Sequence, residues 1–294
     1  MPFLSKLGRE ISTATGRPFV VHEQRSVGGG CINSAFVLIG DGQRYFVKLN
    51  RASKADMFAA EFAGLQEIAR ANAIRVPTPI CCGTDDDYAY LVLNYIERGS
   101  GNAQSMEQFG HDLAQMHRFT RNRYGWDRDN TIGATPQLNT PSDDWVEFWQ
   151  HRRLGFQLEL AARNRGGANL QRKGEQLLGR MGTFFHDYAP APSLLHGDLW
   201  SGNYTIDTQG RAVIFDPAVY YGDRETDLAM TELFGGFSGR FYAAYCDAFP
   251  LQPSYAVRKT LYNLYHVLNH FNLFGGGYAS QAEHMIDALV SEIR

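Results

Sequence analysis

The sequence predicts an α+β fold of two lobes, in which an antiparallel sheet forms the N-terminal lobe and helices form most of the C-terminal lobe. Two hairpin signals lie within the first 95 residues, and helical patterns dominate from residue 104 onward. A polar segment, ERGSGN at 97–102, lies between the two regions and looks like a connector. We therefore expect one lobe of residues 1–95 and a second of residues 96–294.

The N-terminal lobe is expected to begin with a helix over 3–15 and an extended stretch near 19–25. The apolar segments INSAFVLIG and QRYFVKLN then flank Asp41-Gly42, a dipeptide typical of a tight hairpin turn. Residues 54–71 repeat apolar side chains at the spacing of one helical face. A second hairpin, ICCGT and YAYLVLNYI, follows around the acidic turn Asp85 to Asp87, which reads as a solvated turn.

The C-terminal lobe is expected to contain helices over 104–119, 142–164 and 169–187. The segment YTIDTQGRAVIFD reads as two short strands around Gln209-Gly210, the second ending at Asp216. The longest uncharged run, Leu261 to Ala282, contains three asparagines and two histidines, so it predicts a buried amphipathic helix and not a membrane span.

Composition limits the classes of function. The 294 residues are 44% hydrophobic, which is ordinary for a soluble core, and the net charge of −3 gives no broad electrostatic surface for nucleic acid or anionic lipid. The four cysteines form no CxxC pair, so neither a zinc site nor a disulfide framework is expected. Charged residues interrupt the N-terminal apolar stretch, which argues against a signal peptide. We expect a cytoplasmic protein with no nucleic-acid or membrane partner.

The stretch LLHGDLWSGNYTI at 194–206 carries the strongest chemical signal. Asp198 and Asn203 lie five residues apart on one turned loop, and the following hairpin would bring Asp216 back beside them. Two carboxylates and an amide oxygen are ligands suited to Mg²⁺, and this spacing is used by phosphoryl-transfer enzymes. Asp198 would accept the proton of the attacking hydroxyl while Asn203 and Asp216 hold the metal. The alternative is a turn in which Asp and Asn cap the backbone.

A phosphate anchor is expected upstream. Lys48 lies on the second strand of the first hairpin, and Glu61 lies on the apolar face of the helix over 54–71. A carboxylate on that face is costly without a cation, so Lys48 is its natural partner, and the pair would position the phosphates of ATP. A surface ion pair is the alternative reading.

The glycines Gly28, Gly29 and Gly30 precede the first hairpin, where a backbone without side chains can approach phosphates. They lack the G-x-G-x-x-G spacing, and a hairpin turn is the alternative. No G-x-x-x-x-G-K-[ST] motif is present, which argues against a P-loop NTPase. His266 and His270 share a helical face, but the stretch HVLNH lacks the glutamate of H-E-x-x-H, so a structural or pocket-lining pair is favoured.

Taken with these residues, the sequence resembles the aminoglycoside phosphotransferase-like kinases and, more closely, the fructosamine kinase (ketoamine 3-kinase) family, within the protein kinase-like superfamily. The resemblance rests on GGGCIN at 28–33, YFVKLN at 45–50, HGDLWSGN at 196–203, FDPAVYYGDRETDLAMTELFGGF at 215–237 and LYNLYHVLNHFNLFGG at 261–276. It implies a protein kinase-like fold and phosphorylation, by ATP, of the sugar 3-hydroxyl of a fructosamine or ribulosamine on an amine or a protein lysine. The 3-phosphate is unstable in that family, so phosphorylation leads to deglycation.

The resemblance also implies roles for individual positions. It gives Asp198 as the base, Asn203 and Asp216 as metal ligands, Lys48 with Glu61 as the phosphate anchor, and Leu93, Asn94 and Tyr95 as the adenine-facing hinge. Asn94 replaces an expected acidic residue and Ser34 an expected second asparagine. Because adenine recognition at the hinge mostly uses backbone groups, the replacement at Asn94 should have little effect on nucleotide binding.

The substrate is expected to meet the block that follows the catalytic loop. Trp200, Tyr220 and Tyr221 could form flat walls for a sugar ring, and Glu225 and Asp227 could accept bonds from hydroxyls or pair with the amine. The alternative for these residues is core packing and capping of the helix TDLAMTELF, and for Asp227 the two readings are balanced.

Three points stay open on the sequence alone. The substrate could instead be another hydroxylated amine such as an aminoglycoside. The alternative from another class is a catalytically silent nucleotide-binding regulator. The regulator is disfavoured because the chain keeps the complete set of Lys48, Asp198, Asn203 and Asp216. Cys31, beside the glycines, could be a redox-sensitive thiol, so a monomer or a redox-sensitive dimer is expected. A small apolar residue filling the strand start is the alternative for Cys31.

Overall fold

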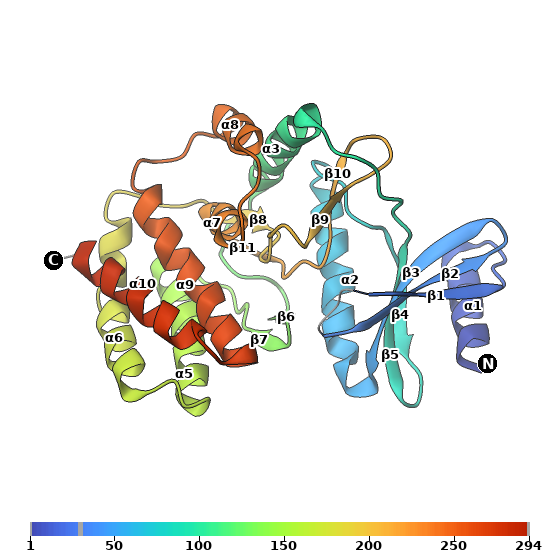
Figure 1. Ribbon diagram of the computed structural model, residues 1–294, viewed down its shortest axis with the longest axis horizontal. Helices are drawn as coiled ribbons and strands as arrows, with labels where there is room; N and C mark the ends of the chain where they lie inside the picture. The colour runs from blue at the N-terminus through green and yellow to red at the C-terminus, as the bar shows by residue number, and fades with distance from the viewer. Residues whose placement is uncertain (1, 29–31, 293–294) are drawn as a thin grey trace.

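The computed structural model describes residues 2–28 and 32–292 and shows the two expected lobes side by side (Figure 1). The N-terminal lobe holds a five-stranded antiparallel sheet in the order β1-β2-β3-β5-β4. Its elements are α1 (Pro2–Thr15), β1 (Glu23–Val27), β2 (Ser34–Gly40), β3 (Gln43–Arg51), the 3₁₀ turn η1 (Ala52–Lys54), α2 (Ala55–Arg70), β4 (Pro79–Thr84) and β5 (Tyr88–Asn94).

The first hairpin turn forms where the sequence predicted it. Asp41 and Gly42 both have positive φ angles, 48° and 72°. Two such residues between antiparallel strands match a turn whose twist suits a hairpin, and this geometry favours Asp-Gly. The turn fixes the pairing of β2 with β3, which sets Ala35 opposite Lys48.

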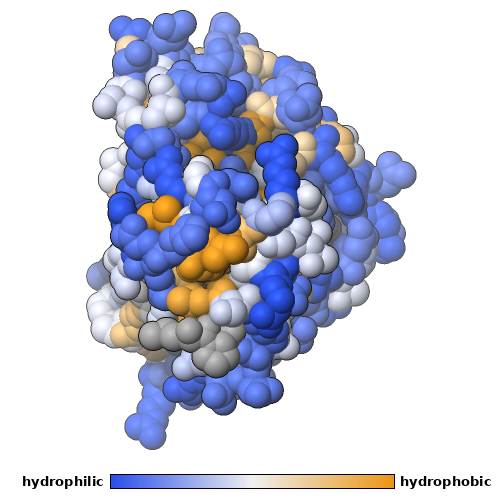
Figure 2. Space-filling view, turned by 90° about the vertical axis from the view of Figure 1, so that its right-hand side faces the viewer, coloured by the Kyte–Doolittle hydropathy of each residue, from blue (hydrophilic) through white to orange (hydrophobic). Residues whose placement is uncertain are grey.

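Two helices cover opposite faces of this sheet (Figure 1). Alternate residues of β5 point to opposite sides, as strand geometry requires. Tyr90 and Val92 pack in the cluster that contains Leu7 of α1. Ala89, Leu91 and Leu93, on the other face of the strand, pack in the larger core with α2. Figure 2 looks onto the α1 side, where a group of hydrophobic residues lies among hydrophilic ones. Both faces of the sheet are thus packed, and α2 lies on the face toward the C-terminal lobe.

The C-terminal lobe is mostly helical. Its elements are α3 (Ala103–His117), β6 (Asn130–Ile132), β7 (Thr135–Gln137), α4 (Trp145–Phe148), the π-helix η2 (Trp149–Gly155), α5 (Phe156–Arg163), α6 (Ala168–Leu178), the 3₁₀ turn η3 (Met181–Phe185), β8 (Ser193–Leu195), β9 (Tyr204–Ile206), β10 (Ala212–Ile214), β11 (Tyr220–Gly222), α7 (Glu225–Leu233), α8 (Gly239–Ala248), α9 (Tyr255–Phe274) and α10 (Tyr278–Glu292).

Three predicted helices differ from those observed. The segment 142–164 begins at Trp145 after an Asp144 cap and contains a π-helix, and 169–187 ends as an α-helix at Leu178. The run Leu261 to Ala282 is divided, since α9 ends at Phe274 and Gly275 takes a φ of 68°. None of the helices in the described ranges 2–28 and 32–292 is both long and apolar enough to cross a bilayer.

The short strands of the C-terminal lobe were largely missed by the sequence analysis. β9 pairs with β10 as predicted, but the pairs β6 with β7 and β11 with β8 were not expected. The second of these is important for the site, because it sets the segment after residue 216 against the strand that enters the HGD loop.

Contacts other than the linker also join the lobes. Glu67 of α2, which is 4% exposed, accepts hydrogen bonds from the Arg121 guanidinium and the Tyr221 hydroxyl, each at 2.7 Å. The Arg121 guanidinium also lies 4.5 Å from the centroid of the Tyr221 ring. Helix α2 is therefore tied to β11 by a network that combines charge, hydrogen bonding and cation–π contact.

Candidate active site

The HGD segment forms a tight loop between β8 and β9. Gly197 has a φ of 81°, and a Cβ at that position would lie 2.2 Å from the carbonyl oxygen of Ala218. Only glycine suits this backbone, because other residues rarely adopt the conformation and would also collide with the neighbouring chain. Glycine at this position therefore lets the main chain turn sharply, immediately before Asp198.

Asp198 and Asn203 contact each other across this loop. The Asn203 amide Nδ2 donates to the Asp198 main-chain oxygen at 2.8 Å and to its carboxylate Oδ2 at 3.2 Å. Asn203 is 6% exposed, so these bonds hold its side chain in one orientation. Since the amide nitrogen faces Asp198, the amide oxygen is the atom left for a cation.

The β9–β10 hairpin returns the chain to the same place, as the two-strand reading predicted. Tyr204 pairs with Ile214, and the N–H of Phe215 donates to the Asn203 carbonyl oxygen at 3.0 Å. Asp216 comes next with a φ of 58°, the left-handed region that Asp and Asn tolerate better than most residues. Asp216 therefore lies beside the loop of Asp198 and Asn203, although β10 itself ends at Ile214.

Lys48 connects the two lobes at this point. Its ammonium Nζ lies 2.6 Å from Glu61 Oε1 and 2.6 Å from Asp216 Oδ1. The Lys48 side chain is 7% exposed, so the pair with Glu61 is buried. Burial opposes the charge on Lys48, but the attraction of Asp216 and Glu61 outweighs it and raises the lysine pKa. The pKa of Glu61 is also raised, because burial and the Asp216 charge outweigh the attraction of Lys48.

Asp198 has the electrostatics of a base that works near neutral pH. Burial disfavours its carboxylate, the Asp216 charge disfavours it further, and together they raise its pKa to about 7 despite the hydrogen bond from Asn203. A general base is most effective when its pKa is near the working pH. The loop thus offers a proton acceptor whose pKa is set by its surroundings.

The donor set fits Mg²⁺. Asp216 Oδ1 is bound to Lys48, and its side chain is 45% exposed. Within the described residues its second oxygen, Oδ2, has no hydrogen-bond partner. The carboxylates of Glu61 and Asp216 contact the Lys48 ammonium, and Asp198 lies close enough to Asp216 for that charge to raise its pKa. Carboxylate and amide oxygens with open access to water suit a cation that keeps several waters or phosphate oxygens.

The predicted nucleotide contacts are only partly described. Gly28 is exposed and has open space around it, whereas Gly29, Gly30 and Cys31 lie outside the described residues. In the hinge, Leu93 is buried, and the N–H groups of Asn94 and Tyr95 donate to Thr78 and Arg44.

Four residues that the sequence analysis assigned to the substrate surface face the protein interior in this structure. Tyr220 and Tyr221 are 2% and 0% exposed. Glu225, 0% exposed, forms a two-point ion pair with Arg258 at 2.7 and 2.9 Å. Asp227, 1% exposed, accepts the main-chain N–H groups of residues 196 and 197. The core-packing alternative is the one observed, and each carboxylate already has its partners.

Trp200 is the predicted substrate residue that remains at the surface. It is 37% exposed, and its ring meets Phe234 at a centroid distance of 6.3 Å. Phe234 in turn packs against His270 at 4.9 Å. His266 is buried, and its pKa is lowered to about 3 by burial and the neighbouring His270. His266 therefore has the structural role that was one of the two alternatives favoured from HVLNH. His270 lies in a row of rings with Trp200 and Phe234, which we call the aromatic rim.

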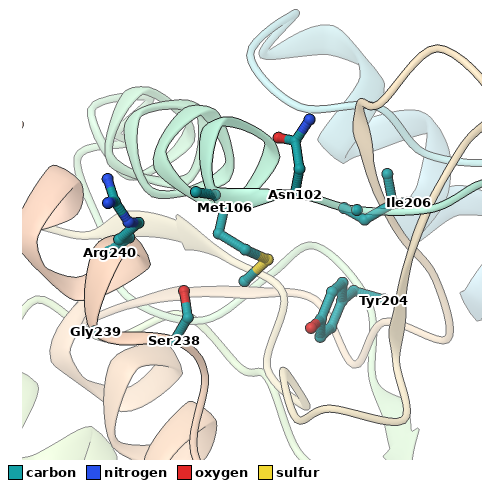
Figure 3. Close-up of a pocket in the computed structure, with 9 residues that line it drawn as sticks. Asn102, Met106, Tyr204, Ile206, Ser238, Gly239 and Arg240 are labelled. Atoms are coloured by element: carbon teal, nitrogen blue, oxygen red, sulfur yellow. The ribbon is translucent and has the colours of Figure 1, made fainter.

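A cavity of about 790 Å³ lies elsewhere, between the start of α3, strand β9 and the start of α8 (Figure 3). Met106 and Tyr204 extend toward it from α3 and β9. Asp198, Asn203 and Asp216 do not line it. This cavity is thus separate from the cluster around Lys48, although Tyr204 directly follows Asn203.

Comparison with known proteins shows the family of this chain. The sequence model of the fructosamine kinase family matches residues 4–292. A protein of Synechocystis sp. named as a probable ketoamine kinase is 51% identical over 285 residues, covering 95% of this chain and 94% of that protein. The chloroplastic protein-ribulosamine 3-kinase of Oryza sativa is 44% identical over 265 residues, covering 89% and 77%.

Solved structures give the same fold. The crystal structure of a protein described as a fructosamine-3-kinase, from Haemophilus somnus, has a TM-score of 0.89 at 27% identity and covers 97% of this chain and 96% of that one. An aminoglycoside phosphotransferase in complex with ADP and hygromycin B has a TM-score of 0.64 at 17% identity, covering 97% and 98%, which shows a shared kinase-like fold. By its sequence and fold, this chain belongs to the fructosamine kinase family.

Proposed function

We propose that this protein transfers the γ-phosphoryl group of ATP to the sugar 3-hydroxyl of ketoamines, the fructosamine or ribulosamine adducts of amines and protein lysines. The observation that carries the proposal is the cluster of Lys48, Asp198, Asn203 and Asp216, drawn from both lobes, in a chain of the fructosamine kinase family. The deglycation that follows would come from the instability of the 3-phosphate.

In the proposed reaction Asp198 accepts the proton of the attacking hydroxyl. Lys48, oriented by Glu61, binds phosphate oxygens of ATP, and the Asn203 amide oxygen and Asp216 hold the metal. Mg²⁺ held there would offset the negative charge of the phosphate groups. A cation beside Asp216 would also favour the ionised form of Asp198, because the Asp216 charge is one cause of its raised pKa.

The distribution of carboxylates supports one sugar with one amine over a polycation. An aminoglycoside needs several carboxylates in the substrate pocket, yet Glu225 and Asp227 are buried with partners of their own. Trp200, Phe234 and His270 instead offer an aromatic rim, which suits a sugar ring and the apolar stem of a lysine.

The test is a comparison of substrates with a matched catalytic variant. We expect kcat/KM for ribulose- or fructose-derived lysine adducts to exceed that for kanamycin-like compounds by at least about 100-fold, roughly 2.7 kcal/mol of transition-state binding. Asp198→Ala should lower kcat by roughly 10²- to 10⁴-fold while ATP binding is retained. Comparable turnover of an aminoglycoside, with no transfer to any ketoamine, would refute the substrate proposal and leave the kinase chemistry intact.

Redox sensitivity remains a separate proposal, since Cys31 lies outside the described residues. We propose that oxidation of this thiol, or a disulfide between two chains, reversibly inhibits the enzyme. Wild type and Cys31→Ser are compared in activity and mass after peroxide and then thiol treatment. Equal sensitivity of the two proteins would rule out Cys31 as the sensor.

A further inference from the structure

Helix α2 carries Glu61 and contacts the C-terminal lobe on both sides of that residue. Two residues before Glu61, the Ala59 carbonyl oxygen accepts a hydrogen bond from the Arg128 guanidinium at 3.1 Å. Three residues after it, a Cβ added at Gly64 would lie 3.1 Å from Val219 Cγ2. The lack of a side chain at Gly64 therefore lets the helix lie close against the segment that follows residue 216. The C-terminal lobe thus contacts α2 beside the proposed phosphate anchor.

Glu67 makes a further polar contact, six residues after Glu61 and so about 9 Å further along the helix axis. Its Oε1 accepts hydrogen bonds from the Tyr221 hydroxyl and the Arg121 guanidinium, each at 2.7 Å. Its Oε2 accepts one from Arg70, three residues later on the same helix, also at 2.7 Å. One oxygen of the carboxylate therefore bonds to the C-terminal lobe, and the other bonds within α2.

The hydroxyl that binds Glu67 is itself held firmly. Tyr221 pairs with Leu194 of β8 on one side, and on the other it exchanges two main-chain hydrogen bonds with Gly125, each at 2.8 Å. Burial and the hydrogen bond to Glu67 raise the pKa of the Tyr221 hydroxyl, so it keeps its proton and donates it. Glu67 is thus bound to a donor whose place is fixed by the strands of the C-terminal lobe.

The contact of α2 with its own lobe is of another kind. Buried apolar side chains of the helix share one core cluster with those of β5, namely Phe58, Leu65 and Ile68 with Leu91 and Leu93. Apolar burial has no preferred direction, whereas a hydrogen bond weakens when its distance or angle changes. The polar contacts with the C-terminal lobe therefore restrict the rotation of α2 and its position along its axis more than the contacts with the sheet do.

This restriction matters because the Lys48–Glu61 pair joins two different elements. Lys48 lies on β3 of the sheet, and Glu61 lies on α2, with 2.6 Å between Nζ and Oε1. A hydrogen bond of this length tolerates little displacement of either element. The position of α2 on the C-terminal lobe therefore affects whether the Glu61 carboxylate meets the Lys48 ammonium.

We propose that Glu67 is a positioning residue for nucleotide binding: through its Oε1 it fixes α2 on the C-terminal lobe and thereby holds Glu61 against Lys48. The proposal rests on the role of Lys48 and Glu61 as the phosphate anchor, proposed above. Glu67 is 4% exposed and its oxygens are bonded to protein groups, so its effect on ATP passes through the helix.

The experiment measures binding of a non-hydrolysable ATP analogue with Mg²⁺ by calorimetry, with no acceptor present. Glu67→Leu removes both oxygens and should weaken binding by about tenfold, as for loss of coupling through a rigid element. Glu67→Gln keeps one oxygen, which can face Tyr221 and Arg121, and should retain most of the wild-type affinity. Arg70→Ala is the matched control, because it removes the partner within α2 alone, and it should bind the analogue as wild type does.

Two further variants separate the proposed role from a loss of stability. Leu7→Ala removes a fully buried side chain on the other face of the sheet, and it should lower the melting temperature without changing the Kd of the analogue. In a Glu61→Gln protein, Glu67→Leu should have little further effect, because both substitutions disturb the same pair. Losses that multiply in the double variant would refute the proposal, as would wild-type affinity in Glu67→Leu or equal losses in its Leu and Gln variants.

Steady-state kinetics distinguish this proposal from the proposed function. In Glu67→Leu the KM for ATP should rise by about tenfold, while the KM for a ketoamine stays nearly unchanged. A raised ketoamine KM with an unchanged KM for ATP would contradict a role in nucleotide binding. If the wild type phosphorylates no ketoamine, the function proposed above fails, and the binding experiment alone decides the role of Glu67.

Discussion

Replacing Asp198 by Asn should make the protein more stable at pH 8 while it removes most of its activity. The Asp198 carboxylate is ionised in the unfolded chain above its ordinary pKa of 3.8, whereas burial and the Asp216 charge raise its pKa to about 7 in the folded protein. Folding at alkaline pH therefore places a negative charge where the surroundings disfavour it. Asn has nearly the same shape, carries no charge and can still accept the hydrogen bond from the Asn203 amide.

The size of the effect follows from the difference between the two pKa values. Since one pKa unit corresponds to about 1.4 kcal/mol, ionised Asp198 costs the folded protein on the order of 4 kcal/mol. A group with a raised pKa contributes its stability below the unfolded pKa and loses it as the pH rises through the folded pKa. The advantage of Asp198→Asn should thus be absent below about pH 4, grow up to about pH 7 and stay constant above it.

Thermal unfolding of both proteins without nucleotide, at a series of pH values, measures this difference. At roughly 2 °C for each kcal/mol in a chain of this size, we expect Asp198→Asn to melt about 8 °C above wild type at pH 8. Asp216→Asn is the matched control, because the same substitution there removes a partner of buried Lys48 at 2.6 Å and should lower the melting temperature. A melting temperature for Asp198→Asn at or below that of wild type at pH 8 would refute the assigned electrostatics.

Three further predictions concern the metal, the rim and the lobe contact. Asp216→Asn should raise the Mg²⁺ concentration needed for half-maximal turnover, which a Mg²⁺ titration measures; an unchanged requirement would remove Asp216 from the metal site. Trp200→Ala should raise the KM for a lysine ketoamine by about tenfold with the KM for ATP unchanged, the loss of one aromatic contact; equal KM values in steady-state kinetics would exclude Trp200 from the substrate surface. Tyr221→Phe should cost about 1 kcal/mol in denaturant unfolding, since Glu67 loses one donor, and leave the ketoamine KM unchanged; a raised KM would reinstate Tyr221 as a substrate contact.

The parts of the site that the sequence predicted are close together along the chain. Asp198, Asn203 and Asp216 fall within one loop and one short hairpin, so local turn and strand patterns were enough to bring them together. The first hairpin was likewise defined by Asp41-Gly42, whose backbone angles depend on those two residues alone. The pairing of Lys48 with Glu61 followed from the cost of a lone carboxylate on an apolar helical face.

The parts that could not be predicted depend on residues far apart in sequence. Glu225 and Asp227 lie near the start of a helix. An acidic residue at such a position can be a helix cap, a substrate contact or one half of a buried pair, and the sequence does not distinguish these roles. Their partners, Arg258 and His117, are 33 and 110 residues away, and no local pattern identifies them. The division of the predicted helix at Gly275 is a simpler omission, because three successive glycines at 275–277 are a recognisable stop signal.

The burial of the segment after Asp216 has a consequence for how the protein is controlled. Residues 217–230 are all buried, and β11 pairs with β8 along part of this stretch. Its hydroxyl groups, on Tyr220, Tyr221 and Thr226, are therefore out of reach of a modifying enzyme in the folded protein. A kinase whose equivalent segment must first be phosphorylated shows a lag before full activity, whereas this protein should turn over at its full rate from the first seconds after mixing. Control of this protein by phosphorylation of this segment is therefore not expected.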